Sequence, residues 1–122
     1  MEAKYKLGDR DINGLYRVIA LRDFGNIKKG EIGGYIESEA NLSHRGNCFV
    51  HGNARVFGNA RVFGDAQVSG NARVFGNAQV SGNARVFGNT QVFDDAQMSG
   101  NTQVFGDARV FGDAQVSGEA QL

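Results

Sequence analysis

The sequence contains no proline and no tryptophan, and its 122 residues include a single cysteine. Glycine is abundant, at 18 residues, and its abundance without proline argues against a collagen-like chain or a disordered linker. The lone Cys48 excludes an internal disulfide and a cysteine-based metal cluster. No apolar run is long enough for a signal peptide or a membrane span, so we expect a cytoplasmic protein with no membrane partner.

The chain also lacks a net charge, because 13 basic residues balance 13 acidic ones. The balance is local as well as global: residues 1–45 carry 8 basic and 7 acidic side chains, and residues 46–122 carry 5 and 6. A protein that binds duplex nucleic acid needs a strongly basic surface. We therefore expect no long nucleic acid as a partner.

The dominant feature of the sequence is a six-residue repeat. Internal repeats are considered first because they determine the fold class. The unit reads Gly-(Asn/Asp)-Ala-(Arg/Gln)-Val-(Phe/Ser), and Asp94 is the only break in the glycine register. Upstream, Gly34-Tyr35-Ile36 and Ala40-Asn41-Leu42 fit the same pattern, before extra residues around Ser43-His44-Arg45 set the later register. The repeating glycines are Gly46, Gly52, Gly58, Gly64, Gly70, Gly76, Gly82, Gly88, Gly100, Gly106, Gly112 and Gly118.

A period of six predicts a short strand followed by a corner. Alternate side chains of a strand share a face, so Ala54 and Val56 point inward while Arg55 and Phe57 point outward. Gly-Asn and Gly-Asp pairs tolerate a positive φ and suit sharp corners. Repeated, this unit gives a coil whose turns stack about 4.8 Å apart. An array of β-hairpins is the alternative, but hairpins need longer strands and would not hold a strict six-residue frame.

Residues 1–32 do not follow the repeat. Lys4 to Leu7 and Leu15 to Leu21 are predicted strands, with Asn13-Gly14 as the turn between them. We expect these residues to form a small N-terminal β cap, because a solenoid end otherwise exposes unpaired strand edges. The solenoid is expected over residues 33–122, and its other end, which stops within a repeat at Leu122, is expected to be buried in an assembly unless the chain is a fragment.

The repeat resembles that of the hexapeptide-repeat proteins, a superfamily of left-handed β-helices that includes many acyltransferases. The opening segment, Tyr16 to Phe24 and Gly33 to Glu39, is similar to the YdcK-like branch of that superfamily. The resemblance implies an all-β fold: a three-sided, left-handed parallel β-helix of about five coils, assembled as a trimer. The left-handed sense is expected from the resemblance alone, since the general crossover rule favours the opposite hand.

If three hexads make a coil, residues 18 apart stack into outward ladders. Arginine precedes phenylalanine on these faces and never serine, whereas glutamine precedes every serine. Thr90 and Thr102 fall at inward positions, so the outward threonine arrays of antifreeze solenoids are missing. The last positions of the hexads form three ladders: Phe57, Phe75, Phe93, Phe111; Phe63, Ser81, Ser99, Ser117; and His51, Ser69, Phe87, Phe105.

An unbroken stripe of phenylalanine is too apolar to leave in water and usually marks a contact surface. A trimer interface is the first interpretation of this stripe. The second is that arginine and phenylalanine pairs in a cleft between protomers hold a planar anionic ligand, since rings stack on a base while guanidinium groups bind phosphate. The candidate ligand-binding residues are Arg55, Phe57, Arg73, Phe75, His51, His44 and Arg45.

Catalysis is less well supported by the sequence. Acyltransferases of the superfamily use a histidine as general base between protomers, so the resemblance makes His44 and His51 formal candidates, although a solvated or interface role is the simpler interpretation. No Ser-His-Asp grouping, phosphate-cradling loop or metal-ligand spacing occurs. We therefore expect no catalytic residue, no metal and no cofactor. We favour a non-catalytic oligomer that binds a small phosphate-bearing, nucleotide-like ligand between protomers, with sequestration of that ligand as its role. An acyl-CoA-dependent acyltransferase and a purely structural assembly module are the alternatives.

Overall fold

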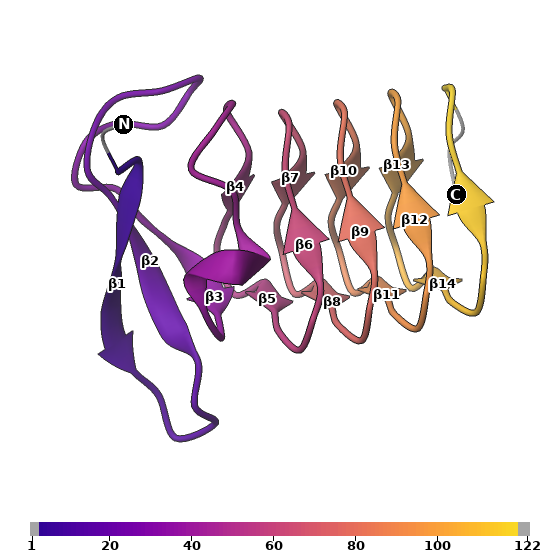
Figure 1. The fold of residues 1–122 in the computed structure, drawn as a ribbon, viewed down its shortest axis with the longest axis horizontal. Coiled ribbons are helices and arrows are strands. Elements are labelled where there is room, and N and C mark those ends of the chain that lie inside the picture. Colours follow the sequence, from indigo (N-terminus) through magenta and orange to yellow (C-terminus); the bar gives the residue numbers. More distant parts are fainter. Residues whose placement is uncertain (1–2, 120–122) are drawn as a thin grey trace.

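The computed structural model describes residues 3–119, which form a three-sided β-solenoid with an antiparallel hairpin at its N-terminal end (Figure 1). The strands form three sheets that run along the axis, and the coils follow one another from the hairpin towards the C-terminus. The expected all-β solenoid of about five coils is confirmed. The only helical element in residues 3–119 is a 3-10 turn, η1 (Glu39–Asn41).

One face of the solenoid is a seven-stranded sheet that includes the hairpin. Its order is β1-β2-β3-β5-β8-β11-β14, with β1 and β2 antiparallel and every pair from β3 onward parallel. We call this the first face. Its strands are β1 (Tyr5–Arg10), β2 (Tyr16–Ala20), β3 (Ile32–Ile36), β5 (Arg55–Val56), β8 (Arg73–Val74), β11 (Gln91–Val92) and β14 (Arg109–Val110).

The other two faces are four-stranded parallel sheets. The second face consists of β4 (Phe49–Val50), β7 (Gln67–Val68), β10 (Arg85–Val86) and β13 (Gln103–Val104). The third face consists of β6 (Arg61–Val62), β9 (Gln79–Val80), β12 (Gln97–Met98) and β15 (Gln115–Val116).

From β4 onward each strand pairs with the strand 18 residues later, so three hexads make one coil as expected, whereas β3 and β5 are 20 residues apart because of the extra residues around Ser43 to Arg45. Arg55 lies opposite Arg73, and Val56 opposite Val74. Backbone hydrogen bonds hold the coils together, for example from Arg55 N to Ala72 O at 2.9 Å and on to later coils in the same pattern. The stacking predicted from the glycine period is therefore confirmed.

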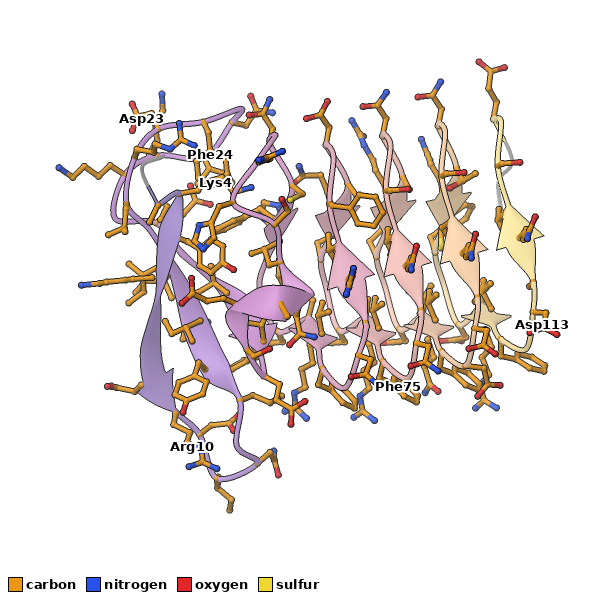
Figure 2. All side chains as sticks on the ribbon, viewed as in Figure 1. Lys4, Arg10, Asp23, Phe24, Phe75 and Asp113 are labelled. Atoms are coloured by element: carbon orange, nitrogen blue, oxygen red, sulfur yellow. The ribbon has the colours of Figure 1, made fainter. Side chains whose placement is uncertain are left out.

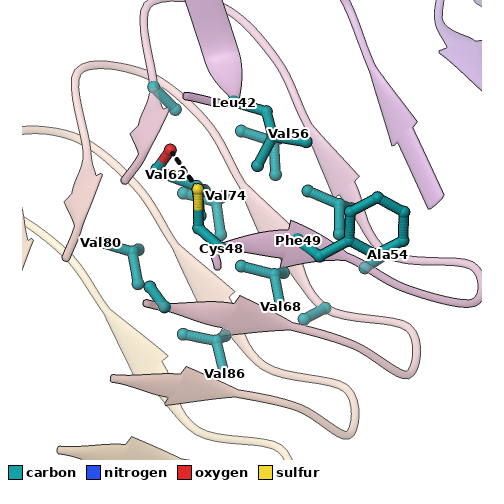
Figure 3. Packing of buried hydrophobic residues seen from close by; sticks show 14 of the residues in the cluster. Leu42, Cys48, Phe49, Ala54, Val56, Val62, Val68, Val74, Val80 and Val86 are labelled. Carbon is teal, nitrogen blue, oxygen red and sulfur yellow. Dashed lines mark hydrogen bonds between the residues drawn. The ribbon is translucent and has the colours of Figure 1, made fainter. Parts of the chain in front are cut away.

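The interior contains the small and large apolar residues of each hexad (Figure 3). Alanine and valine side chains such as Ala54, Val56 and Val80 are fully buried, and each buried valine contributes about 1.5–3 kcal/mol to folding. Thr90 and Thr102 occupy the small inward position, as predicted, and within residues 3–119 their hydroxyl oxygens have no hydrogen-bond partner.

The corners explain why glycine recurs. Each glycine of the repeat has a positive φ, and Asp94, which replaces one of them, also adopts it, with φ of 60°. Only glycine enters this region without strain, and aspartate is among the side chains that tolerate it. The Asp94 carboxylate accepts a hydrogen bond from the backbone N–H of Gly112 in the next coil.

The predicted N-terminal strands are confirmed as β1 and β2, with Asn13-Gly14 in the turn. The hairpin continues the first face, because β2 pairs with β3 and β3 pairs with β5. The boundary between residues 32 and 33 stays a prediction, and β3 begins at Ile32. The end of the last repeat, at residues 120–122, lies outside the described residues.

Across residues 3–119, no helix has the length and apolar character needed to cross a membrane.

Candidate functional site

The predicted phenylalanine ladder is a stack of rings along the first face (Figure 2). Ring centroids are 5.1 Å apart from Phe57 to Phe75 and from Phe75 to Phe93, and 5.4 Å apart from Phe93 to Phe111. Neighbouring planes differ by 1°, 4° and 11°, so the rings face one another within the stacking range. We refer to these four residues as the phenylalanine ladder.

This arrangement decides which rings have a face free for a ligand. Phe75 and Phe93 each have a ring on both sides, so only their edges face outward. Phe57 begins the stack and Phe111 ends it, each with one stacked neighbour along the ladder. Phe75 therefore offers a ligand an edge only. Phe57 has no stacked ring on its N-terminal side among residues 3–119, and Glu37 of the preceding coil lies on that side, with its carboxylate bonded to the Gly58 backbone N–H.

Arg55 and Arg73 line the same hollow as Phe57. The two arginines occupy adjacent coils in parallel register, and with Asn13, Leu15 and Phe57 they line a hollow of about 210 Å³. Asn13 and Leu15 come from the end of the hairpin, which brings the turn next to the first face. Among residues 3–119, neither guanidinium group forms an ion pair with a carboxylate.

Aromatic contacts position the cations at the start of this face. The guanidinium carbon of Arg55 is 5.9 Å from the centre of the Tyr35 ring, and that of Arg17 is 4.6 Å from it. Arg17 also donates a hydrogen bond to the Tyr35 hydroxyl. Cation–π contact of this kind stabilises a guanidinium group without neutralising its charge.

The structure places His51 on the second face, in another hollow. This groove has a volume of about 760 Å³, and its lining includes His51, Ser69, Arg85 and Phe87. His51 makes a hydrogen bond to the side chain of Gln67 and an edge contact with the Phe49 ring. His51 and the Arg55–Arg73 pair therefore line different hollows on different sheets.

His44 lies at the N-terminal end, stacked on Tyr5 with ring centroids 4.1 Å apart. Its Nδ1 accepts a hydrogen bond from the backbone N–H of Lys4 at 3.1 Å, and its Nε2 lies 2.6 Å from a Glu39 carboxylate oxygen. Both ring nitrogens are thus engaged within the protein. The neighbouring Arg45 is exposed. Of the seven predicted ligand residues, Arg55, Phe57 and Arg73 share one hollow, and Phe75 is the next ring of the ladder.

Sequence reasoning missed a buried polar cluster at the same end. Lys4 is fully buried, with its Nζ 3.3 Å from the Cys48 sulfur and 4.8 Å from the centre of the Phe24 ring (Figure 2). Burial lowers the pKa of Lys4 and raises the pKa of Cys48, and it also raises the pKa of Tyr5. Lys4 lies outside the repeat, so no pattern in the sequence indicates its burial.

A metal centre is not formed by the described residues: no group of three or more His, Cys, Asp or Glu side chains in residues 3–119 is placed to hold an ion. The hollows, by contrast, are bounded mainly by guanidinium, amide and aromatic groups, with one carboxylate, that of Asp65, in the larger hollow. Such groups recognise anions and flat rings rather than cations.

These observations define a β-solenoid whose faces carry ordered ladders of side chains. Its repeats are similar to the family described as YdcK beta solenoid repeat, whose model matches residues 54–68, 66–79, 78–94 and 103–118. The repeats therefore resemble those of YdcK-like β-solenoids, and the matched segments lie within the solenoid, C-terminal to the opening segment. A comparison with curated proteins finds no match.

Proposed function

We propose that this protein binds a small phosphate-bearing ligand, without transforming it, at the hollow formed by Arg55, Arg73 and Phe57. The observation that carries the proposal is the in-register pair of arginines with no carboxylate partner in residues 3–119. Adjacent coils hold the two backbones about 4.8 Å apart, a spacing at which two guanidinium groups can bind one phosphate. Holding two like charges this close is unfavourable unless an anion lies between them.

Phe57 supports a nucleotide-like ligand in particular. Phe57 lines the same hollow as Arg55 and Arg73, so a base can contact its ring where the ladder begins while the phosphate meets the arginines. Neutral net charge favours a small ligand, because long nucleic acid would require many more cations.

The size of the hollow favours a site that a second copy completes. At about 210 Å³ it is smaller than the roughly 300–1,000 Å³ of typical ligand pockets. The phenylalanine ladder continues from the hollow along the same face, and its last ring, Phe111, is 55% exposed. We propose that the ladder lies in a trimer interface, as in the hexapeptide-repeat proteins that the sequence resembles, with the ligand in the cleft between protomers.

Acyl transfer from acyl-CoA is the second function that the resemblance suggests. His44 engages both ring nitrogens within the protein, and His51 bonds to Gln67. His44 therefore supplies no unoccupied general base, whereas within the described residues His51 is bonded through one ring nitrogen only. Binding without catalysis is the better supported proposal, because no carboxylate in residues 3–119 forms a contact that would orient His51 as a base.

Calorimetry with mononucleotides, cyclic dinucleotides and acyl-CoAs tests the proposal. Arg73→Ala should weaken binding by about 1.5–3 kcal/mol, as expected for a charged hydrogen bond, and leave the fold intact. Arg109→Ala is the matched control, because Arg109 is exposed on the same face two coils further along. The control should bind as the parent does.

Two results would overturn the proposal. The first is the absence of binding heat for every compound in the series, which would favour a structural assembly module. The second is turnover of an acyl-CoA that His44→Ala or His51→Ala abolishes, which would identify an acyltransferase.

A further inference from the structure

The second face carries a ladder from which one aromatic ring is missing. Its outward positions at the hexad ends are His51, Ser69, Phe87 and Phe105, in consecutive coils. The backbone N–H of each of the first three bonds to the coil after it, at 2.7–2.9 Å, so the four positions stack in register. Serine therefore occupies a place that phenylalanine fills in the phenylalanine ladder.

The missing ring leaves one face of Phe87 uncovered. Phe105 stacks on the C-terminal side of Phe87, with centroids 5.4 Å apart and planes 12° apart. On the other side lies the half-buried Ser69, and no ring in residues 3–119 stacks there. His51 and Phe87 are two coils apart, about 9.6 Å along the axis. One flat ring midway lies about 4.8 Å from each, which is within the stacking range.

The groove of about 760 Å³ is lined by His51, Ser69 and Phe87, so it includes the place at Ser69 where the ladder has no ring. Its volume falls within the range of about 300–1,000 Å³ that is usual for small-molecule sites. Ser69 lies between His51 and Phe87 in the ladder, Gln67 and Arg85 lie in the adjacent outward row, and Gly25 to Ile27 close one end from the N-terminal segment.

One wall of the groove is held in place by hydrogen bonds. The Gln67 amide nitrogen donates to the carbonyl oxygens of Asn47 at 2.8 Å and Asp65 at 3.2 Å. Its Oε1 is therefore the acceptor towards His51, and His51 Nε2 carries the donated proton. A wall fixed in this way loses little conformational freedom when a ligand binds.

The part of the groove one coil beyond Gln67 carries a positive charge. Arg85 is exposed and forms no ion pair with a carboxylate in residues 3–119. It lies two residues before Phe87, on the same strand side, and both residues line the groove. Asp65 also lines the groove, one coil nearer to the N-terminus, and its carboxylate accepts from the Asn47 backbone N–H at 3.0 Å. An anionic ligand is thus directed to the Arg85 side.

We infer that this groove is a second binding site, for one flat aromatic ring that carries an anionic group. The ring takes the vacant place in the ladder and stacks on Phe87, and the anionic group binds Arg85. A mononucleotide and a simple aromatic carboxylate share this chemistry. The site lies on a different sheet from the Arg55–Arg73 hollow and does not depend on it.

Filling the vacancy with a protein side chain is the direct test. Ser69→Phe completes the ladder and should lower the affinity for AMP and for indole-3-carboxylate by at least about tenfold, since stacking on a base is worth about 1–3 kcal/mol. Ser81→Phe is the matched control, because Ser81 also ends a Gln-Val-Ser hexad and lies on the third face, away from the groove. The control should bind both probes as the parent does.

Arg85→Gln tests recognition of the anionic group separately from recognition of the aromatic ring. It is also the test variant to use if Ser69→Phe does not fold. It should weaken AMP and indole-3-carboxylate by about tenfold, as expected for loss of a charged hydrogen bond, and leave adenosine, which has the ring alone, unchanged. Comparison of the two anionic probes tells a preference for phosphate from one for carboxylate. Ribose 5-phosphate, which has no aromatic ring, should bind at least about tenfold more weakly than AMP.

Three results would overturn the inference: no binding of any aromatic probe by the parent, equal losses in Ser69→Phe and Ser81→Phe, or AMP binding that Arg73→Ala removes and Ser69→Phe leaves intact. The last result would leave the proposed function standing, since it assigns the nucleotide to the Arg55–Arg73 hollow. Loss in Ser69→Phe with full binding of aromatic probes in Arg73→Ala supports the second site.

Discussion

The ammonium group of Lys4 lies 2.7 Å from the carbonyl oxygen of Cys48, and the same group donates to the carbonyl oxygen of Gly46 at 3.3 Å. One coil later the equivalent carbonyls, those of Gly64 and Ala66, accept backbone N–H groups of the coil before them, at 3.1 and 3.2 Å. The first coil has no such predecessor at this corner. The lysine side chain therefore supplies the donors that a preceding coil would have supplied.

Asn41 does the same at another corner. Its amide nitrogen donates to Gly58 O at 3.2 Å and to Ala60 O at 2.8 Å, while its oxygen accepts from the backbone N–H groups of Glu37 and Ser38. The end of the solenoid is thus closed by side chains as well as by β3. Buried carbonyls that lost these donors would be costly, because little water reaches them.

Lys4→Met is expected to destabilise the protein. The change keeps most of the side-chain volume but leaves two carbonyl oxygens without their donor, at a cost of about 2–4 kcal/mol. Urea denaturation followed by circular dichroism measures the change. Lys6→Met, at an exposed position on the same strand, is the control and should stay within about 0.5 kcal/mol of the parent. Equal effects of the two variants would contradict the role assigned to Lys4.

The burial of Tyr5 predicts the direction in which the folding stability changes at alkaline pH. Its hydroxyl donates to Leu42 O at 2.5 Å, and burial raises its pKa above the ordinary value of 10.0. Above about pH 10 the unfolded chain loses this proton while the folded chain keeps it, so stability falls as pH rises. Tyr5→Phe should show a shallower loss between about pH 10 and 11 in urea titrations. Parallel profiles for the parent and the variant would show that Tyr5 does not contribute.

Much of the fold could be predicted because the same six-residue pattern of inward and outward side chains recurs many times. A single hexad of small, polar and large residues is weak evidence for a solenoid strand. The pattern of Ala54 and Val56 recurs in one frame along the chain, so every repeat supports the same inward assignment. Lys4 shows the limit of this reasoning. It occurs once, in a segment without periodicity, and only the three-dimensional path of the N-terminal segment brings it to Cys48.

Val80→Asp tests the inward assignment of the large position. Val80 is fully buried between Val62 and Met98 on the third face, so a carboxylate there would be buried without a partner. We expect a loss of several kcal/mol, roughly 3–5, in thermal or urea unfolding. Gln97→Asp, at an exposed outward position on the same face, should have little effect. A variant at Val80 that melted like the parent would refute the assignment.

Substitutions at two glycines distinguish the energetic cost of backbone strain from that of a steric clash. Gly82 and Gly112 have φ of 66° and 67°, but a Cβ at Gly82 would lie 2.7 Å from Gly100 N, whereas one at Gly112 would meet no atom of residues 3–119 within 4 Å. Gly112→Ala should therefore cost only the strain of the left-handed region, about 1–2 kcal/mol. Gly82→Ala adds a clash with backbone and should cost more, about 3 kcal/mol or above. Equal losses in urea unfolding would mean that the coils separate readily at this corner.

The candidate site was less predictable than the fold. The 18-residue spacing was enough to align Arg55 with Arg73 and to stack the phenylalanine ladder. It could not place the hairpin turn, because the position of Asn13 depends on the pairing of β2 with β3, where the register shifts. It also could not show that Phe75 lacks a free face, since this depends on ring orientation rather than on register.

The phenylalanine ladder provides the test of assembly. Rings stacked on one another still expose their edges, and a row of such edges is an apolar stripe of the kind that marks a contact surface. If the ladder lies in the proposed trimer interface, Phe75→Ser combined with Phe93→Ser should give a smaller species in sedimentation velocity. Both residues point outward and leave the core unchanged, so circular dichroism should still report a folded solenoid. The matched control is Phe63→Ser, since Phe63 is an outward ring on the third face and 38% exposed. A parent that sediments as a trimer, with an unchanged mass in the double variant, would move the interface to the Gln-Ser positions of the third face.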